Sequence, residues 1–340
     1  MNSERVGKPG SRVMQNHTEL ISTLADGRFH SGENLGTLLG VSRAAVWKRL
    51  RQLKLEYGLE VDAVKGRGYR LKEPLDLLNA STVHQQLSEL GVSDDLPLHL
   101  HLAIPSTNSW LMHQGTLGAA SGTVCLAEHQ TAGKGRHGRQ WISPFGRNIY
   151  LSMLWRFDLP PTQLAGLSLA SAVGVLRALR ELRCDEAGLK WPNDILWQQR
   201  KLAGLLLEVS GEASGPSQVV IGLGLNTWLG EEGSLIGQPW VDLCSIPNVL
   251  KQPRNHLAAM LIKHLRDVAE SYQREGLAAF LDEWHQYDLM IGKQVEIRSA
   301  NHSQWGEHLG IDRQGALRLK VDGVEKHFHA GEVSLRAGSD

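Results

Sequence analysis

The spacing of apolar residues changes along this 340-residue chain and divides it into three parts. Helical spacing dominates residues 20–55, the middle of the chain mixes short apolar runs with longer helical repeats, and residues from 291 onward alternate apolar with polar. Because single hydrophobic cores stop growing at about 250–300 residues, this length indicates two or three domains. The patterns place them at residues 1–73, 74–287 and 288–340.

The N-terminal part is predicted to be a winged helix-turn-helix. A first helix ends before Gly27, a short second helix follows Ser31, and Gly40 makes the turn to a third helix that Ser42 caps. Residues 59–71 then read as two strands around a tight basic turn, which is the pattern of a wing. In such a domain the second helix of the motif enters the major groove of DNA.

Charge is concentrated in the same part of the chain. The whole chain carries 36 Lys+Arg and 36 Asp+Glu, but the first 72 residues hold 13 basic and seven acidic residues. Their net charge of +6 predicts a polyanionic partner, with a solvated basic face or a domain kept for protein contacts as alternatives. The helix over residues 43–55 places Val46, Leu50 and Leu53 on one face and Arg43, Lys48, Arg49 and Arg51 on the other. The predicted DNA-binding residues are Ser42, Arg43, Trp47, Lys48, Arg49, Lys65 and Arg67.

The central part is predicted to be an α+β domain with a mixed sheet. Strand-like runs at residues 98–104, 123–127 and 149–157 do not alternate strictly with the helical repeats, which begin at 107 and cover 166–182 and 254–274. Strict alternation would instead indicate a parallel sheet.

A glycine-rich segment, Gly133–Gly138, matches the G-x-G-x-x-G pattern of dinucleotide-binding loops. That pattern requires the glycines to open a helix, whereas here Pro144 and Gly146 follow and lead into a strand. What remains is a flexible loop with the cations Lys134, Arg136 and Arg139. Backbone N–H groups and cations in such a loop suit a phosphate or carboxylate, although a plain surface loop is the alternative.

Two further segments favour phosphate chemistry. Leu189–Asp194 places a Lys and an Asp around a Pro turn, and Lys201 begins an apolar strand. A Lys for phosphate and an Asp for Mg²⁺ suit nucleotide activation, although Pro-Asn-Asp alone is more often only a turn. The sequence has no Walker A motif, which excludes a P-loop NTPase.

Six motifs follow one another along the central part of the chain: Ser106–Asn108, Glu128–Arg139, Ser143–Gly146, Lys190–Asp194, Arg200–Gly204 and Gly222–Asn226. In this order they closely resemble those of biotin–protein ligases, and the N-terminal domain resembles that of the bifunctional bacterial members, which also repress the biotin operon. The resemblance implies ATP and Mg²⁺ as cofactors, with biotin as substrate and biotinyl-5′-AMP as intermediate and corepressor. It implies transfer of biotin to a lysine of a biotin carboxyl carrier protein, binding to biotin operator DNA, and a homodimer formed on ligand binding.

The same resemblance assigns residues to roles. Biotin is assigned to Ser106, Thr107, Asn108, Gln130, Lys134, Gly135, Arg136 and Lys201. ATP or the adenylate is assigned to Arg136, Arg139, Trp141, Lys190, Asn193 and Asn226. The catalytic candidates are Lys201, Arg136, Lys190 and Asp194, with Asp194 also the Mg²⁺ candidate. No Ser or Cys nucleophile is expected, because biotin's own carboxylate attacks the phosphate. Lys134 and His137 stand where many relatives have Arg, so their roles are less secure.

The C-terminal part is predicted to be a small SH3-like β-barrel. Strands are expected at residues 294–299, 307–311, 316–321 and 324–336, with Asp322-Gly323 as a hairpin turn. His327 and His329 share an expected strand face, but no further metal ligands lie near them in the sequence. A metal site formed by these two histidines is therefore only the less favoured alternative.

Other features of the sequence argue against a membrane or secreted protein, and some alternative functions stay open. No run of about 18 apolar residues and no signal peptide is apparent, and Cys125, Cys184 and Cys244 form no pattern, so a reduced, cytoplasmic protein is expected. The alternatives are a ligase that no longer regulates DNA, a non-catalytic ligand sensor, and a lipoate ligase. Dimerisation is expected at a sheet edge formed by residues 219–226.

Overall fold

The computed structural model describes residues 9–93, 95–298, 303–330 and 334–337, with side chains described from residue 17 to residue 330 within these ranges. Contacts divide the chain into two compact units, residues 1–78 with 144–147, and residues 79–143 with 148–340. The C-terminal residues that we expected to form a third domain fall within the second unit. The domain boundaries at residues 73 and 287 therefore stay predictions.

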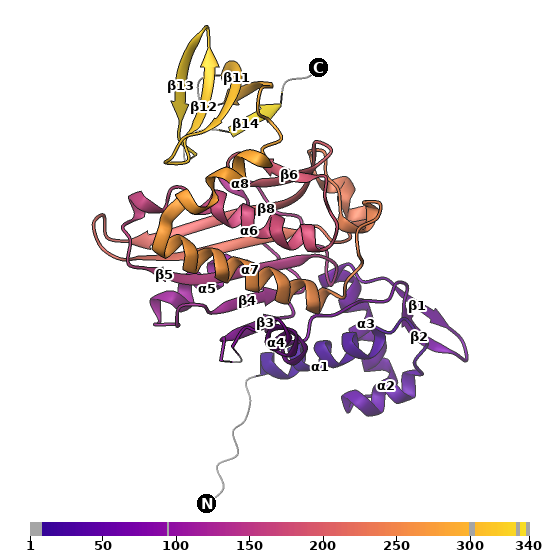
Figure 1. The fold of residues 1–340 in the computed structure, drawn as a ribbon. Coiled ribbons are helices and arrows are strands. Elements are labelled where there is room, and N and C mark those ends of the chain that lie inside the picture. Colours follow the sequence, from indigo (N-terminus) through magenta and orange to yellow (C-terminus); the bar gives the residue numbers. More distant parts are fainter. Residues whose placement is uncertain (1–8, 94, 299–302, 331–333, 338–340) are drawn as a thin grey trace, which may run out of the picture. The chain divides into compact units, whose positions relative to one another are not determined.

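The first unit is the predicted winged helix-turn-helix (Figure 1). Its elements are α1 (Pro9–Leu24), α2 (Gly32–Leu39), α3 (Arg43–Tyr57), β1 (Val61–Val64) and β2 (Gly68–Leu71). Ser31 Oγ accepts a hydrogen bond from Asn34 N at 3.0 Å, and Ser42 Oγ accepts one from Ala45 N at 3.3 Å, so both predicted helix starts are capped. Gly40 ends α2 in the left-handed conformation that a tight turn requires.

The wing is anchored to the segment that joins α1 to α2. His30 and Tyr69 exchange backbone hydrogen bonds of 2.8 Å in both directions, which adds a short bridge to the hairpin of β1 and β2. A Cβ at Gly68 would lie 2.0 Å from the His30 carbonyl oxygen, so only glycine permits this close approach. The wing strands are therefore fixed to the helical part of the domain.

The second unit is built on a seven-stranded mixed sheet in the order β3-β4-β5-β9-β8-β7-β6. Only β3 and β4 pair in parallel, and all other neighbours are antiparallel, as the α+β prediction requires. Its strands are β3 (Leu98–His101), β4 (Val124–Ala127), β5 (Ile149–Phe157), β6 (Ala187–Lys190), β7 (Asp194–Trp197), β8 (Arg200–Gly211) and β9 (Ser217–Leu225).

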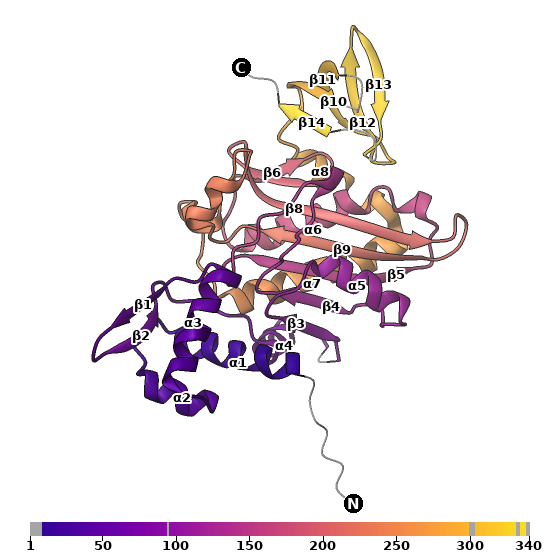
Figure 2. The same cartoon turned by 180° about the vertical axis from the view of Figure 1, so that it is seen from behind.

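Helices cover both faces of this sheet (Figures 1 and 2). α5 lies on one face, where Leu111 packs with Cys125, Leu154 and Val220. α6 and α7 pack against each other on the opposite face. The helices are α4 (Ala80–Glu89), α5 (Thr107–Thr116), α6 (Leu167–Glu181), α7 (Arg254–Glu275) and α8 (Leu281–Gln286), and the short 3-10 turns are η1 (Arg136–Gly138), η2 (Pro161–Leu164), η3 (Gly230–Leu235), η4 (Leu243–Ser245) and η5 (Gly276–Phe280).

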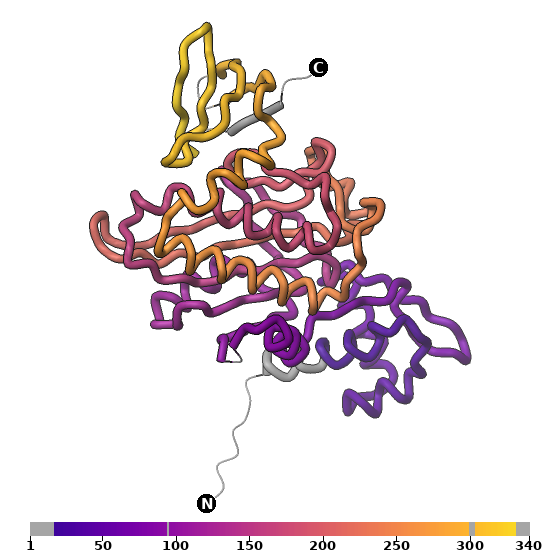
Figure 3. The backbone as a smooth tube through the Cα atoms, in the orientation of Figure 1, coloured from indigo at the N-terminus to yellow at the C-terminus, as the bar shows by residue number. Residues whose placement is uncertain are grey.

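The expected dimerisation edge at residues 219–226 is wrong. Strand β9 lies inside the sheet and is paired along its length with β5 on one side and β8 on the other. Its backbone groups are already used in these ladders, so β9 has no free edge to offer a second chain. The hairpin from β8 to β9 can be followed in Figure 3.

One segment, Pro161–Glu181, is long and apolar enough to cross a membrane by length and composition alone, contrary to our sequence expectation. Of its most apolar window, 72% is buried inside the fold. It contains α6, which packs against α7 and the sheet. The apolar residues of this segment are therefore explained by packing.

The C-terminal part is a five-stranded antiparallel sheet in the order β13-β12-β11-β10-β14. Its strands are β10 (Gln294–Arg298), β11 (Ser303–Ile311), β12 (Leu317–Val321), β13 (Val324–Phe328) and β14 (Ser334–Ala337). The single expected strand over residues 324–336 is thus two strands. His329 follows the end of β13, and His327 Nδ1 lies 2.8 Å from Asp312 Oδ2. Among the described residues no group of three potential metal ligands occurs.

Candidate active site

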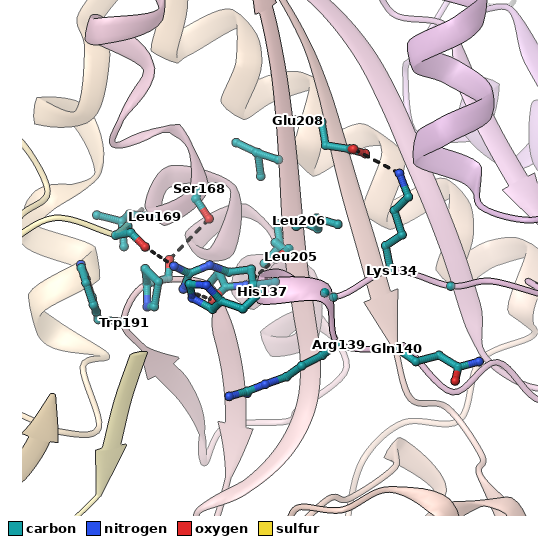
Figure 4. A pocket seen from close by; sticks show the side chains of 18 of the residues that line it. Lys134, His137, Arg139, Gln140, Ser168, Leu169, Trp191, Leu205, Leu206 and Glu208 are labelled. Atoms are coloured by element: carbon teal, nitrogen blue, oxygen red, sulfur yellow. Dashed lines mark hydrogen bonds and ion pairs between the residues drawn. The ribbon is translucent and has the colours of Figure 1, made fainter. Parts of the chain in front are cut away.

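The glycine-rich loop is a narrow hairpin that borders a cavity of about 810 Å³ (Figure 4). Trp141 N donates to the Gly133 carbonyl at 2.9 Å, and Gly135 N donates to the Arg139 carbonyl at 2.7 Å. Its tip is the 3-10 turn η1, and no α-helix begins there, which agrees with our rejection of a dinucleotide-binding loop. The loop, α6, the Trp191–Asn193 turn and β8 supply most of the lining, and Gly315 and Ala330 complete it.

Arg136 projects from this loop to the cavity wall. Its guanidinium donates to Asn193 Oδ1 at 3.3 Å and to the backbone carbonyl of Ala330. Burial lowers the pKa of Arg136, while the nearby carboxylate of Asp194 acts in the opposite direction. The two hydrogen-bond acceptors, the Asn193 side chain and the Ala330 carbonyl, are uncharged. Because burial removes much of the water around the Arg136 guanidinium, an anion placed in the cavity would stabilise its charge.

Lys134 extends from the loop toward Glu208 on β8. Its ammonium lies 3.4 Å from Glu208 Oε1, and Figure 4 shows the two side chains facing each other across the cavity rim while Arg139 extends away from them. Both side chains are partly exposed, so this pair contributes at most about 1 kcal/mol. It connects the loop to the sheet.

A buried polar cluster joins the start of α5 to the residues before the loop. Gln130 Oε1 accepts hydrogen bonds from Thr107 N at 2.9 Å and Thr107 Oγ1 at 3.1 Å. Asn108 Nδ2 donates to the Leu206 carbonyl at 3.0 Å, and Ser152 Oγ donates to Asn108 Oδ1 at 2.6 Å. These side chains are buried and oriented by one another, as a site for a polar ring requires.

Ser106 caps helix α5, unlike Thr107 and Asn108, which belong to the buried polar cluster. It is the N-cap of α5, and its Oγ lies 3.5 Å from Ser109 N. It therefore fixes the start of the helix that carries Thr107 and Asn108.

Two residues of the predicted site, Lys190 and Asp194, lie in one row across the sheet with two glycines. Lys190 pairs with Asp194, Asp194 with Gly204, and Gly204 with Gly224, on β6, β7, β8 and β9 in turn. Residues that pair directly project from the same face of a sheet. The row therefore places the predicted Lys and Asp beside two positions without side chains.

Trp141 fills the space above those two glycines. A Cβ on Gly224 would lie 2.4 Å from the Trp141 ring, and a Cβ on Gly204 would lie 3.1 Å from it. Trp141 Nε1 is buried and has no hydrogen-bond partner in the part of the chain that the structure describes. An unpaired buried donor is costly, so an acceptor from a bound ligand would stabilise this arrangement.

Lys201 and Asp194 form an ion pair beside the same ring. Lys201 Nζ lies 2.7 Å from Asp194 Oδ1 and 5.4 Å from the centre of the Trp141 ring. The backbone of Lys201 also accepts a hydrogen bond from Asn226 Nδ2 at 3.3 Å, and the same amide donates to the Val241 carbonyl at 3.2 Å. Asn226 therefore holds the strand end that carries Lys201.

The structure divides the predicted ligand-binding residues into two groups. Those that line the cavity are Lys134, Gly135, Arg136, Arg139 and Asn193. Those outside its lining are Ser106, Thr107, Asn108, Gln130, Trp141, Lys190, Asp194, Lys201 and Asn226. The second group forms the polar cluster at α5 and the charged row beside Trp141.

The predicted DNA-binding residues lie in the first unit. Arg43, Trp47 and Lys48 are exposed on α3, and Lys65 and Arg67 are exposed at the turn of the wing. Arg49 differs from our prediction of an exposed basic face. It is only partly exposed, and its Nη1 is buried with no hydrogen-bond partner among the described residues. Ser42 acts as the helix cap described above.

Sequence reasoning missed two buried features of the site. Ser152 was overlooked although it is a polar residue in the middle of an apolar strand, a signal that the sequence does contain. Arg254, at the start of α7, donates from Nη1 to Glu128 Oε2 at 2.8 Å and from Nη2 to the Asn148 carbonyl at 2.7 Å. No local pattern could pair residues 126 positions apart.

Comparisons with known proteins agree with this geometry. The model of the Biotin/lipoate A/B protein ligase family matches residues 102–226, an HTH domain model matches residues 17–70, and the Biotin protein ligase C terminal domain model matches residues 290–336. The bifunctional ligase/repressor BirA of Escherichia coli is 44% identical over 94% of this chain and 97% of its own length. The chain belongs to the biotin–protein ligase family.

Other members of the family agree with this assignment. BirA of Bacillus subtilis is 30% identical over 96% of this ligase and 99% of its own length. The biotin protein ligase of Aquifex aeolicus in complex with biotin and ATP superimposes with a TM-score of 0.62 at 25% identity, covering 71% of this chain and 99% of that one. The family and the fold class predicted from the six motifs and the N-terminal pattern are confirmed.

Proposed function

We propose that this ligase joins biotin to ATP, forming biotinyl-5′-AMP, and then transfers biotin to a lysine of a biotin carboxyl carrier protein. The observation that carries the proposal is the ion pair of Lys201 with Asp194 beside Trp141. Lys190 pairs with Asp194 in the sheet, and the Asp194 carboxylate lies close enough to Arg136 to act on its pKa. Cations there would offset the repulsion between a carboxylate and a triphosphate. That repulsion is about 4 kcal/mol for two unit charges 4 Å apart at an effective dielectric of 20.

In the first step a carboxylate oxygen of biotin attacks the α-phosphorus of ATP, and the bond to the leaving pyrophosphate breaks. We assign Thr107, Asn108 and Gln130 to the biotin ring, because they are buried and oriented by hydrogen bonds. Ser106 supports them as the cap of α5. Lys201 holds the reacting carboxylate, and Arg136 holds the phosphate of the product.

In the second step the neutral amine of the acceptor lysine attacks the acyl carbon, the bond to the phosphate oxygen breaks, and AMP leaves. The amine loses one proton, which passes to solvent water. Arg136 restrains the adenylate until the acceptor arrives, because its guanidinium projects from the loop into the cavity. Lys190 contributes positive charge toward the nucleotide, and Trp141 contributes the N–H donor of its ring.

The residues present fit a magnesium ion that arrives with the nucleotide. Mg²⁺ is usually held by one or two carboxylates together with substrate phosphates, and it would neutralise phosphate charge here. Asp194 supplies one carboxylate, and its Oδ1 already contacts Lys201. The ion would therefore depend on the phosphates for most of its ligands.

The N-terminal unit supports a second activity, repression of the biotin operon. The exposed basic residues of α3 and of the wing suit operator DNA, with biotinyl-5′-AMP as corepressor and a homodimer as the binding form. Because β9 lies inside the sheet, the dimer must use another surface.

One experiment tests both activities. Purified chain, biotin and MgATP are incubated with a biotin carboxyl carrier domain, and labelling of that domain is measured. The same mixture without carrier is then used in gel shifts on the promoter of the chain's own biotin operon. Carrier labelling without a biotin-dependent shift would remove the repressor activity, and a shift without labelling would indicate a ligand sensor.

A lipoate ligase is the nearest chemical alternative, because one family model covers both activities. Replacing biotin with lipoate in the labelling assay distinguishes them. We expect labelling with biotin only.

A further inference from the structure

Two arginines of the wing rest on one aromatic ring. The guanidinium carbon of Arg67 lies 4.3 Å from the centre of the Phe29 ring, and that of Arg70 lies 4.7 Å from it. Phe29 belongs to the segment between α1 and α2, far in sequence from the wing that it supports. A cation held over an aromatic face is attracted by the ring's quadrupole.

The two arginines differ in how their charge is balanced. Arg70 forms an ion pair with Asp62, with Nη2 at 2.9 Å and Nε at 3.0 Å from Asp62 Oδ2. Arg67 is exposed, and no acidic side chain lies within ion-pair distance of it in the part of the chain that the structure describes. Of the two stacked cations, only Arg67 keeps a charge available for an anion.

The backbone next to the ring is fixed to the wing. His30, the neighbour of Phe29, exchanges two backbone hydrogen bonds with Tyr69, which lies between Arg67 and Arg70 in sequence. The close approach of Gly68 to the His30 carbonyl fixes the same contact. The backbone next to Phe29 is therefore tied to the wing, which keeps the Phe29 ring within reach of both arginines.

We propose that Phe29 is a positioning residue for DNA binding, which holds the Arg67 guanidinium in the orientation that contacts a phosphate of the DNA backbone. The proposal rests on the repressor activity proposed above. An exposed arginine loses rotamer freedom when it binds, and stacking on Phe29 removes part of that loss before DNA arrives. Phe29 carries no charge, so it acts on the affinity through Arg67 and not through an ionic contact of its own.

Recognition helix α3 carries a second stack, with the Arg51 guanidinium 4.9 Å from the Trp47 ring. Trp47 is 49% exposed and can touch DNA directly, so a change there would mix positioning with contact. Phe29 is only partly exposed and lies outside α3. A substitution of Phe29 therefore tests positioning without removing a side chain of the recognition helix.

The test is a gel shift on a duplex from the chain's own biotin-operon promoter, with biotin and MgATP, over a series of salt concentrations. Each phosphate contact contributes about 0.9 to the slope of log affinity against log salt. Phe29→Leu should weaken binding about two- to fivefold for each bound domain, with the slope of the wild type. Arg67→Gln should weaken binding and reduce the slope by about 0.9 for each bound domain.

Further variants separate positioning from loss of fold. Phe29→Tyr keeps the ring and should bind as the wild type does. Phe29→Leu combined with Arg67→Gln should bind no more weakly than Arg67→Gln alone, because the ring acts through that arginine. Leu55→Ala removes an 81% exposed apolar side chain from the same domain and should leave binding unchanged.

The outcomes are separable. If the wild type binds the promoter and Phe29→Leu binds equally well, or if its effect adds fully to that of Arg67→Gln, the positioning role is overturned. A shallower salt slope for Phe29→Leu would also overturn it, because a lost phosphate contact would then explain the result. If the wild type itself fails to bind, the repressor proposal fails, and this inference fails with it.

Discussion

Arg254 donates a 2.8 Å hydrogen bond to Glu128, and both side chains are more than nine-tenths buried. Glu128 is two residues from Gln130 of the polar cluster. The other arm of the guanidinium holds the Asn148 carbonyl, while Asn148 Oδ1 accepts hydrogen bonds from Thr227 N and Trp228 N, next to Asn226. One guanidinium therefore connects the segments that carry the proposed biotin and nucleotide residues.

Arg254→Leu should lower the free energy of unfolding by about 3–5 kcal/mol, because it leaves the buried Glu128 carboxylate without its charged partner. The matched control is Arg177→Leu, which breaks the more exposed pair of Arg177 with Glu283 and should cost about 1 kcal/mol or less. Urea unfolding measures both. Equal losses would contradict the assignment of Arg254 to a buried network.

Lys201→Ala should reduce adenylate formation by at least about 100-fold, since it removes the cation placed for the biotin carboxylate. Release of pyrophosphate in the presence of biotin and MgATP measures this step. Lys134→Ala, in contrast, removes a partly exposed pair and should change the rate only several-fold. Normal pyrophosphate release by the Lys201 variant would exclude its assigned role.

Arg136→Gly should still form adenylate but release it, because the guanidinium that holds the phosphate is absent. The expected sign is biotin on lysines of bystander proteins, seen by blotting a mixture that contains serum albumin and no carrier. The wild type is the reference. If bystander labelling does not rise, Arg136 does not retain the adenylate.

Gly222→Ala and Gly224→Ala should each raise the KM of a different substrate, although the two glycines are only two residues apart on β9. A Cβ at position 222 would lie 2.1 Å from Asn108 Oδ1, on the biotin side, and one at position 224 would strike the Trp141 ring. We expect KM for biotin to rise in the first and KM for ATP in the second, by about 5- to 150-fold for a clash of about 1–3 kcal/mol. Gly237→Ala, which meets nothing within 4 Å, is the control. The reverse pattern of KM values would contradict the assignment of the two sides.

Stability should fall as the pH drops below about 6.5. Burial lowers the pKa of His101 and His129, so their neutral forms are preferred in the folded state. Below the ordinary pKa of about 6.5 the unfolded chain takes up protons first, and the free energy of unfolding decreases until the folded pKa is passed. His129→Gln, which keeps a donor for the Ser143 carbonyl, should lose less stability than the wild type between about pH 7.5 and 5.5. Parallel pH curves would contradict this.

Local signals predicted much of the fold. Ser31, Ser42 and Gly40 stand at helix ends, and the preference of these residue types for helix ends depends only on the backbone within a few residues. The strand predicted over residues 149–157 has the same bounds in the structure. The six motifs likewise predicted which residues form the site, and the structure brings two of them, Lys201 and Asp194, into an ion pair. The motifs did not indicate that Asn226 would hold the strand of Lys201.

The sequence by itself determined the capped starts of two N-terminal helices, that the N-terminal part is basic, and to which family the chain belongs, because caps, charge and motifs are properties of short segments. Tertiary structure alone decided that β9 is an inner strand, that Lys190, Asp194, Gly204 and Gly224 form one row, and that Phe29 lies under Arg67. Strand order, register and ring stacking depend on contacts between segments that are distant in sequence. The apolar pattern of a buried strand does not indicate which strands lie beside it.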